Sequence, residues 1–117
     1  MSETSPHAAT LIAKAQDYVD ASNRHDMARI GPMLADDVAY ASSGVGVHEG
    51  AQAVGAMTAA FHTANPDVHW RVEHYRPIGE DGVEFDFVIT LGGEEHLGVE
   101  RIFFTPAGLI RRIEVER

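Results

Sequence analysis

Cysteine is absent from the 117 residues of this chain. Its absence excludes disulfides, thiolate nucleophiles and cysteine-based zinc sites, and it suits a reducing compartment. Long hydrophobic runs are also missing, since no stretch approaches the ~20 apolar residues of a membrane span. The segment from Met1 to Ala9 lacks the basic and apolar regions of a secretory signal. We therefore expect a cytoplasmic protein that does not enter a membrane.

Positive charge is scarce. Nine Lys and Arg residues stand against 18 Asp and Glu, which gives a formal net charge of −9 at pH 7. A phosphate backbone or an anionic lipid surface would be repelled, so neither nucleic acid nor a membrane is an expected partner. Hydrophobic residues make up 44% of the chain, enough for a core, and no linker or repeat divides it. The sequence predicts one domain over residues 1–117.

Helical spacing dominates the first half of the chain. Ser5-Pro6 is a helix-start pattern, because serine can cap a helix and proline at the first helical position loses no hydrogen bond. Apolar residues then recur at three- and four-residue spacing. A second, short helix can follow Asp26 and run through Met27, Ile30, Met33 and Leu34, although Gly31-Pro32 predicts a kink or a break within it. A third begins after Gly50 and ends at Asn65-Pro66, because the residue before proline avoids the helical region.

The second half of the chain has a period of two. A short strand over residues 38–42 and a flexible turn over 43–46 precede the third helix. Alternating apolar and polar residues then predict an antiparallel meander of longer strands over 68–75, 83–91, 99–104 and 109–115. Helices first and sheet afterwards indicate the α+β class.

The order of these elements resembles the nuclear-transport-factor-two-like superfamily, particularly its SnoaL-like and ketosteroid-isomerase-like branches. Two segments contribute to the resemblance, namely Leu34-Ala35-Asp36-Asp37-Val38-Ala39-Tyr40, which leads from the second helix into the first strand, and His48-Glu49-Gly50, which opens the third helix. The resemblance covers nearly the whole chain. It implies a cone-shaped fold, in which a curved antiparallel sheet wraps around three helices and encloses a pocket for a small apolar ligand. It also implies no cofactor and a homodimer. It does not imply one reaction, since the superfamily includes isomerases, cyclases, dehydratases, epoxide hydrolases and carriers without catalysis.

The same resemblance implies roles for individual residues. Tyr18 stands at the same distance before Asp36-Asp37 as the oxyanion-hole tyrosine of ketosteroid isomerase. Glu100 falls where that enzyme carries its protonated aspartic acid. Ser42 falls at the position of the general base, a role that serine cannot fill. The resemblance therefore implies two hydrogen-bond donors for a developing oxyanion, whereas the general base of the isomerase is missing.

Each candidate also has a purely structural interpretation. Tyr18 can be an ordinary core residue, and Glu100 can be a surface carboxylate paired with an arginine of the next strand. If Glu100 faces inward among apolar side chains, its pKa should rise and the group can stay protonated. His48 and His62 flank the third helix, and either can replace the missing base if its side chain turns into the cavity.

The remaining candidates concern the pocket wall and the outer face. His74 shares a strand face with Trp70, but a solvated strand end is the commoner place for such a histidine. Tyr75 is assigned to the outer face, which mixes charged with apolar groups and is expected to pack against a second copy. Seven histidines form no His-Glu-x-x-His pattern, so no metal site is predicted. The predicted pocket wall comprises Leu34, Tyr40, Ser42, Thr58, Trp70, Phe87, Ile89, Leu91, Ile102 and Ile113.

Two functional hypotheses follow, from different classes. The first is a cofactor-independent enzyme that performs acid–base isomerase, cyclase or dehydratase chemistry on a small apolar carbonyl compound. The second is a non-catalytic ligand-binding or dimerisation module, which the serine at position 42 favours. A protein-interaction adaptor would need a sizeable exposed apolar patch, and the sequence indicates none.

Overall fold

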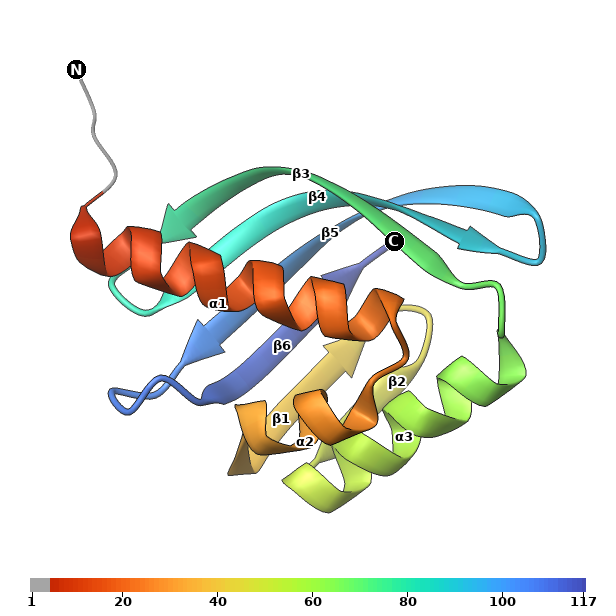
Figure 1. Cartoon of the computed structure of the whole chain (residues 1–117), viewed down its shortest axis with the longest axis horizontal. Helices are drawn as coiled ribbons and strands as arrows, with labels where there is room; N and C mark the ends of the chain where they lie inside the picture. The colour runs from red at the N-terminus through yellow and green to blue at the C-terminus, as the bar shows by residue number, and fades with distance from the viewer. Residues whose placement is uncertain (1–4) are drawn as a thin grey trace.

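The computed structural model describes residues 5–117, and three helices lie on one face of a six-stranded sheet in it (Figure 1). The helices are α1 (Pro6–Asn23), α2 (Met27–Met33) and α3 (Ala51–Ala64). The strands are β1 (Leu34–Ser42), β2 (Gly46–Glu49), β3 (His69–Ile78), β4 (Gly82–Leu91), β5 (Glu94–Phe104) and β6 (Ile110–Glu116). The predicted α+β class is confirmed. Within residues 5–117, no helix has the length and apolar character required to cross a membrane.

The helix starts follow the capping residues of the sequence. Ser5 Oγ accepts a hydrogen bond from the backbone N–H of Ala8 at 3.0 Å, with proline at the start of α1. The side chain of Asp26 caps α2 in the same way. Leu34, which the sequence pattern placed at the end of this second helix, is instead extended and begins β1. Pro32 explains the early end, because proline fits poorly inside a helix.

The sheet is mixed, with the strand order β2-β1-β6-β5-β4-β3. Strands β3 to β6 form the predicted antiparallel meander, but β1 pairs in parallel with β6. The expectation of a wholly antiparallel sheet is therefore wrong at this one junction. Strands far apart in sequence can pair in parallel. The alternation of side chains along a strand is the same in parallel and antiparallel pairing, so the sequence pattern does not reveal the direction. The sequence pattern did not predict β2 and placed only the end of a turn there. The strand carries no alternation of buried and exposed residues that could have marked it, and Val47 is 71% exposed.

A bulge in β3 exchanges the faces of His74 and Tyr75. The pairing register between β3 and β4 shifts between Glu73 and Arg76, and His74 has a positive φ of 59°. Beyond this bulge Tyr75 turns inward and packs on Phe85, with 5.1 Å between ring centroids. The assignment of Tyr75 to the outer face is therefore wrong, because strict alternation fails wherever an extra residue enters a strand.

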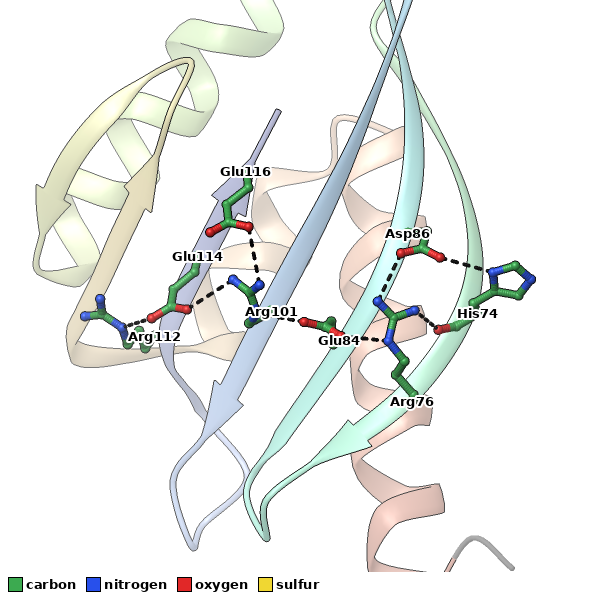
Figure 2. A network of polar contacts seen from close by, with 8 residues as sticks. All are labelled: His74, Arg76, Glu84, Asp86, Arg101, Arg112, Glu114 and Glu116. Atoms are coloured by element: carbon green, nitrogen blue, oxygen red, sulfur yellow. Dashed lines mark hydrogen bonds and ion pairs between the residues drawn. The ribbon is translucent and has the colours of Figure 1, made fainter. Parts of the chain in front are cut away.

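The face of the sheet turned away from the helices carries a continuous network of ion pairs (Figure 2). Glu84 accepts hydrogen bonds from Arg76 and Arg101, both at 2.7 Å. Asp86 joins Arg76 to the exposed His74 ring at 3.1 Å. The guanidinium of Arg76 holds the pKa of Glu84 and of Asp86 below their ordinary values. Glu84 and Asp86 are thus held ionised by paired cations on this face.

The core lies between the helices and the opposite face of the sheet. Its largest fully buried side chains include Phe85, Ile30, Ile102 and Ile113. Burial of such side chains stabilises a fold by about 1.5–3 kcal/mol each, so this layer fixes the curvature of the sheet against the helices. The buried polar side chains of residues 5–117 are few, namely Ser22, Thr58, His62 and Glu100.

Candidate ligand pocket

All four of these buried polar side chains face the same cavity. The cavity has a volume of about 50 Å³ and lies between α1, α3 and the inner face of the sheet. This is room for a few water molecules. Polar groups that share one cavity in an otherwise apolar core are the pattern of a ligand pocket. Its apolar wall includes Val19, Met57, Phe61, Trp70, Phe85, Phe87, Ile89 and Val115.

Glu100 is the central group of the pocket. In the sheet it stands between Phe85 of β4 and Val115 of β6, with its side chain on the helix-covered face and 6% exposed. Among residues 5–117, no hydrogen bond or ion pair reaches its carboxyl group. Burial removes water from this group, and the desolvation raises its pKa to about 8. At neutral pH the group is mainly a protonated acid that can donate a hydrogen bond.

The surface interpretation of Glu100 is therefore wrong. The arginines that a hairpin pairing would have used are occupied on other carboxylates. Arg111 bonds to Asp81 at 2.6 Å, and Arg112 bonds to Glu114 at 2.6 Å.

All three tyrosines of the chain surround Glu100. Burial raises the pKa of Tyr18 well above its ordinary value, and the nearby charge of Glu100 adds to the rise. The same two causes raise the pKa of Tyr40, and they raise that of Tyr75 to about 12. Tyr18 and Tyr40 line the cavity, whereas Tyr75 packs behind Phe85. The pocket thus offers two phenol donors beside the carboxyl group, both protonated over the whole physiological range.

His62 supplies a neutral imidazole on the opposite wall. It is 6% exposed on α3, and neither ring nitrogen has a hydrogen-bond partner among the described residues. Its ring stacks on that of His25, with centroids 4.2 Å apart, and meets Trp70 edge-on at 6.2 Å. Burial, followed by the charge of His25, lowers the pKa of His62 below the ordinary 6.5. An unprotonated ring nitrogen is therefore available in the cavity at neutral pH.

The pocket brings together most, but not all, of the residues that the sequence nominated. His48 does not line it, because it lies on β2, where its ring centroid is 6.5 Å from that of Tyr40. Leu34, Ile102 and Ile113 belong to the solid core, and Leu91 packs at the edge of that core. The predicted residues that line the cavity are Tyr18, Tyr40, Ser42, Thr58, His62, Trp70, Phe87, Ile89 and Glu100.

Two polar or charged residues of the site were not predicted from the sequence. Ser22 lies on the apolar stripe of α1, and a polar residue within that stripe was the available signal. Arg117 also lines the cavity, and no pattern in the sequence marks it. No cluster of three or more metal-ligating side chains occurs within the described residues.

A curved sheet covered on one face by helices, with a small polar-lined cavity between them, defines the cone-shaped class of α+β pocket proteins. Within that class, the chain belongs to the SnoaL-like domain family, whose sequence pattern matches residues 15–108. No curated protein shows detectable similarity to the chain.

Solved structures share the fold over most of its length. An uncharacterised cystatin-fold protein from Novosphingobium aromaticivorans aligns with a TM-score of 0.81 and 21% identity, covering 92% of this chain and 97% of its own. RV0760c from Mycobacterium tuberculosis, in complex with estradiol-17beta-hemisuccinate, gives 0.77 and 23%, with coverages of 90% and 91%. A putative ketosteroid isomerase from Kribbella flavida gives 0.76 and 23%, with coverages of 91% and 76%. At these identities the similarity establishes the fold, whereas the chemistry depends on the residues of the pocket.

Proposed function

We propose that this protein is a cofactor-independent enzyme that moves a proton on a small carbonyl compound, in an isomerisation, cyclisation or dehydration. One observation carries the proposal: a buried carboxyl group without a hydrogen-bond partner shares its cavity with Tyr18 and an unpartnered His62. Hydrogen-bond donors on one side and an imidazole on another are the parts that such a reaction needs.

The roles follow from the protonation states. A ring nitrogen of His62 accepts a proton from the carbon next to the carbonyl, and the C–H electron pair forms a C=C bond. The carbonyl π electrons then move to oxygen, where Tyr18 and the protonated Glu100 donate hydrogen bonds to the developing charge. Return of the proton from His62 to a different carbon completes an isomerisation. Alternatively, the enolate carbon attacks a second carbonyl of the same substrate, whose π electrons move to its oxygen, and return of the proton from His62 to that oxygen completes a cyclisation.

The cavity limits the size of the substrate. Ligand sites for drug-sized molecules usually measure about 300–1,000 Å³, whereas this cavity measures about 50 Å³. A cavity that holds benzene measures about 150 Å³, so even a single ring requires side chains such as Met57, Phe61 or Trp70 to change rotamer. A steroid would require a larger rearrangement.

Binding of a simple phenol tests the donor pair, because its oxygen can accept a hydrogen bond at the place proposed for the substrate oxygen. We expect Tyr18→Phe to weaken the binding of p-cresol about threefold to tenfold, the range for a lost hydrogen bond between uncharged groups. Tyr75→Phe is the matched control, since that ring lies outside the cavity, and its effect should be below about twofold. Calorimetry gives both dissociation constants, and equal effects of the two variants would contradict the proposal.

A non-catalytic binding module is the second candidate, supported by Ser42, which lines the cavity at the place expected for a base. This candidate and the enzyme differ in turnover. Conversion of 3-cyclohexenone to its conjugated isomer, followed by ultraviolet absorbance, is expected of the enzyme. Binding of p-cresol without any conversion would favour the module.

We further propose that the outer sheet face pairs two copies of the chain. Val88 and Leu97 stand opposite each other on β4 and β5, and Leu97 is 76% exposed. They line a groove of about 490 Å³ that is flanked by Arg71, Glu73 and Asp86. A two-fold contact sets the same patch against itself, which would cover the apolar pair and oppose unlike charges.

Light scattering tests this pairing. The wild-type mass should be near that of two chains, and Leu97→Asp should reduce it to that of one. Val47→Asp is the control, because Val47 is similarly exposed at 71% but lies on β2, away from the groove. A wild-type mass near that of one chain would refute the dimer.

A further inference from the structure

Arg117 differs from every other arginine in residues 5–117. The other seven each form an ion pair with an Asp or Glu side chain, as expected in a chain with a net charge of −9. The guanidinium of Arg117 forms no ion pair with the described residues, although acidic side chains are abundant. A lone cation in so acidic a protein needs an explanation from its position.

That position is shared by the pocket and the groove on the outer sheet face, since Arg117 lines both. Arg117 lines the cavity together with Tyr40 and Glu100, and its charge acts on Tyr40 by lowering the pKa of that phenol against the larger effect of burial. Among the residues that line the cavity, Arg117 and Glu100 are the only ones with formally charged side-chain types other than histidine. Because Glu100 is mainly protonated at neutral pH, the guanidinium of Arg117 is the permanently charged side chain among those that line the cavity.

The local backbone holds this arginine in place. The backbone N–H of Arg117 donates a hydrogen bond to Ser43 Oγ at 2.9 Å, which ties the end of β6 to the turn after β1. The guanidinium then lies over Gly44, where an added Cβ would stand 2.6 Å from Cζ and 2.9 Å from Nε. Glycine at position 44 therefore leaves room for the guanidinium beside the cavity.

We propose that Arg117 binds a carboxylate of the ligand, so that the substrate is a small carbonyl compound that is also a monoanionic acid. This rests on the proposed function, since the carbonyl end would occupy Tyr18 and Glu100 while the acid end meets Arg117. A guanidinium matches the planar carboxylate with two parallel N–H donors. One cation balances one negative charge, which favours a carboxylate over a doubly charged phosphate monoester in this acidic protein.

A matched pair of probes tests the assignment, namely 4-hydroxyphenylacetate and its neutral amide, 4-hydroxyphenylacetamide. Each has the same phenol for Tyr18 and Glu100, and they differ mainly in the charge at the far end. We expect the wild-type protein to bind the acid about threefold to fivefold more tightly than the amide, as suits a partly exposed ion pair. Added NaCl should reduce this preference. Arg117→Gln should abolish it by weakening the binding of the acid more than that of the amide.

Arg111→Gln is the control, because it removes the same charge from the opposite end of β6, where Arg111 pairs with Asp81. It should keep the preference for the acid. Equal binding of acid and amide by the wild type, or a preference that survives Arg117→Gln, would overturn the assignment.

The two proposals fail in different ways. If Tyr18→Phe weakens both probes but the wild type shows no preference, the oxygen site stands and the anion site is wrong. If Arg117 gives the preference and Tyr18→Phe and Glu100→Gln change neither affinity, the anion site stands and the proposed catalytic donors are wrong. If neither probe binds at millimolar concentration, both proposals are overturned.

Discussion

The free energy of unfolding of Glu100→Gln, relative to that of the wild type, is expected to be much more positive at pH 9 than at pH 5. The folded pKa of Glu100 is about 8, against 4.5 for the ordinary carboxyl group. The folded state therefore binds the proton more tightly, and stability falls as the pH rises from 4.5 to 8. A shift of this size corresponds to a loss on the order of 4–5 kcal/mol in the wild type. Glutamine cannot ionise, so this loss disappears in the variant.

Urea unfolding at pH 5 and pH 9 gives the free energy of unfolding of both proteins. The effect is the change between the two pH values in the variant minus the same change in the wild type. The constant cost of burying an amide cancels between the two pH values. His62 also contributes, because its lowered pKa makes stability fall as the pH drops below 6.5, but it does so equally in both proteins. Glu95→Gln is the control, since Glu95 is exposed and pairs with Arg71. If the free energies of unfolding of wild type and Glu100→Gln change in parallel with pH, Glu100 ionises normally.

His62→Gln is expected to lower the rate of 3-cyclohexenone isomerisation about 10²-fold to 10⁴-fold, the usual contribution of a general base. In the wild type, kcat/KM should follow a bell-shaped pH profile. Activity should be lost on the acid side as His62 is protonated, below its ordinary 6.5, and on the alkaline side as Glu100 ionises near pH 8. The variant should lose the acid limb and keep the alkaline limb.

His25→Asn separates the base from its stacking partner. Asparagine tolerates the positive φ of 53° at this position, so the backbone should be preserved. Because the charge of His25 helps to lower the pKa of His62, the acid limb should move to higher pH with little change in the maximum rate. A His62→Gln variant with wild-type kcat/KM and an unchanged profile would show that another group acts as the base.

Local patterns in the sequence predicted most of the elements. Ser5-Pro6 and Asp26 mark helix starts by chemistry that needs no tertiary context, and the structure has the helices there. The alternation in residues 83–91 places Phe85 and Phe87 on one face, and both are buried. Such features are recoverable because side-chain period and capping depend on residues within a few positions of each other.

The failures occurred where that local rule is interrupted. The bulge at His74 moved Tyr75 from the outer face to the inner one, and the turn after β1 concealed the short strand β2. The parallel pairing of β1 with β6 joins segments about as far apart as residues 34 and 110. A periodic pattern carries no information about which strand lies beside another.

The sequence by itself determined the α+β class, the acidic charge, the absence of thiol chemistry and the nomination of Tyr18, His62 and Glu100. The tertiary structure decided which nominated groups share a cavity, that His48 is outside it, and that Arg117 is beside it. Pocket membership depends on the crossing of distant strands and helices. The raised pKa of Glu100 likewise comes from desolvation by segments remote in sequence. From the sequence, this rise could therefore be predicted only on the condition that Glu100 faces inward.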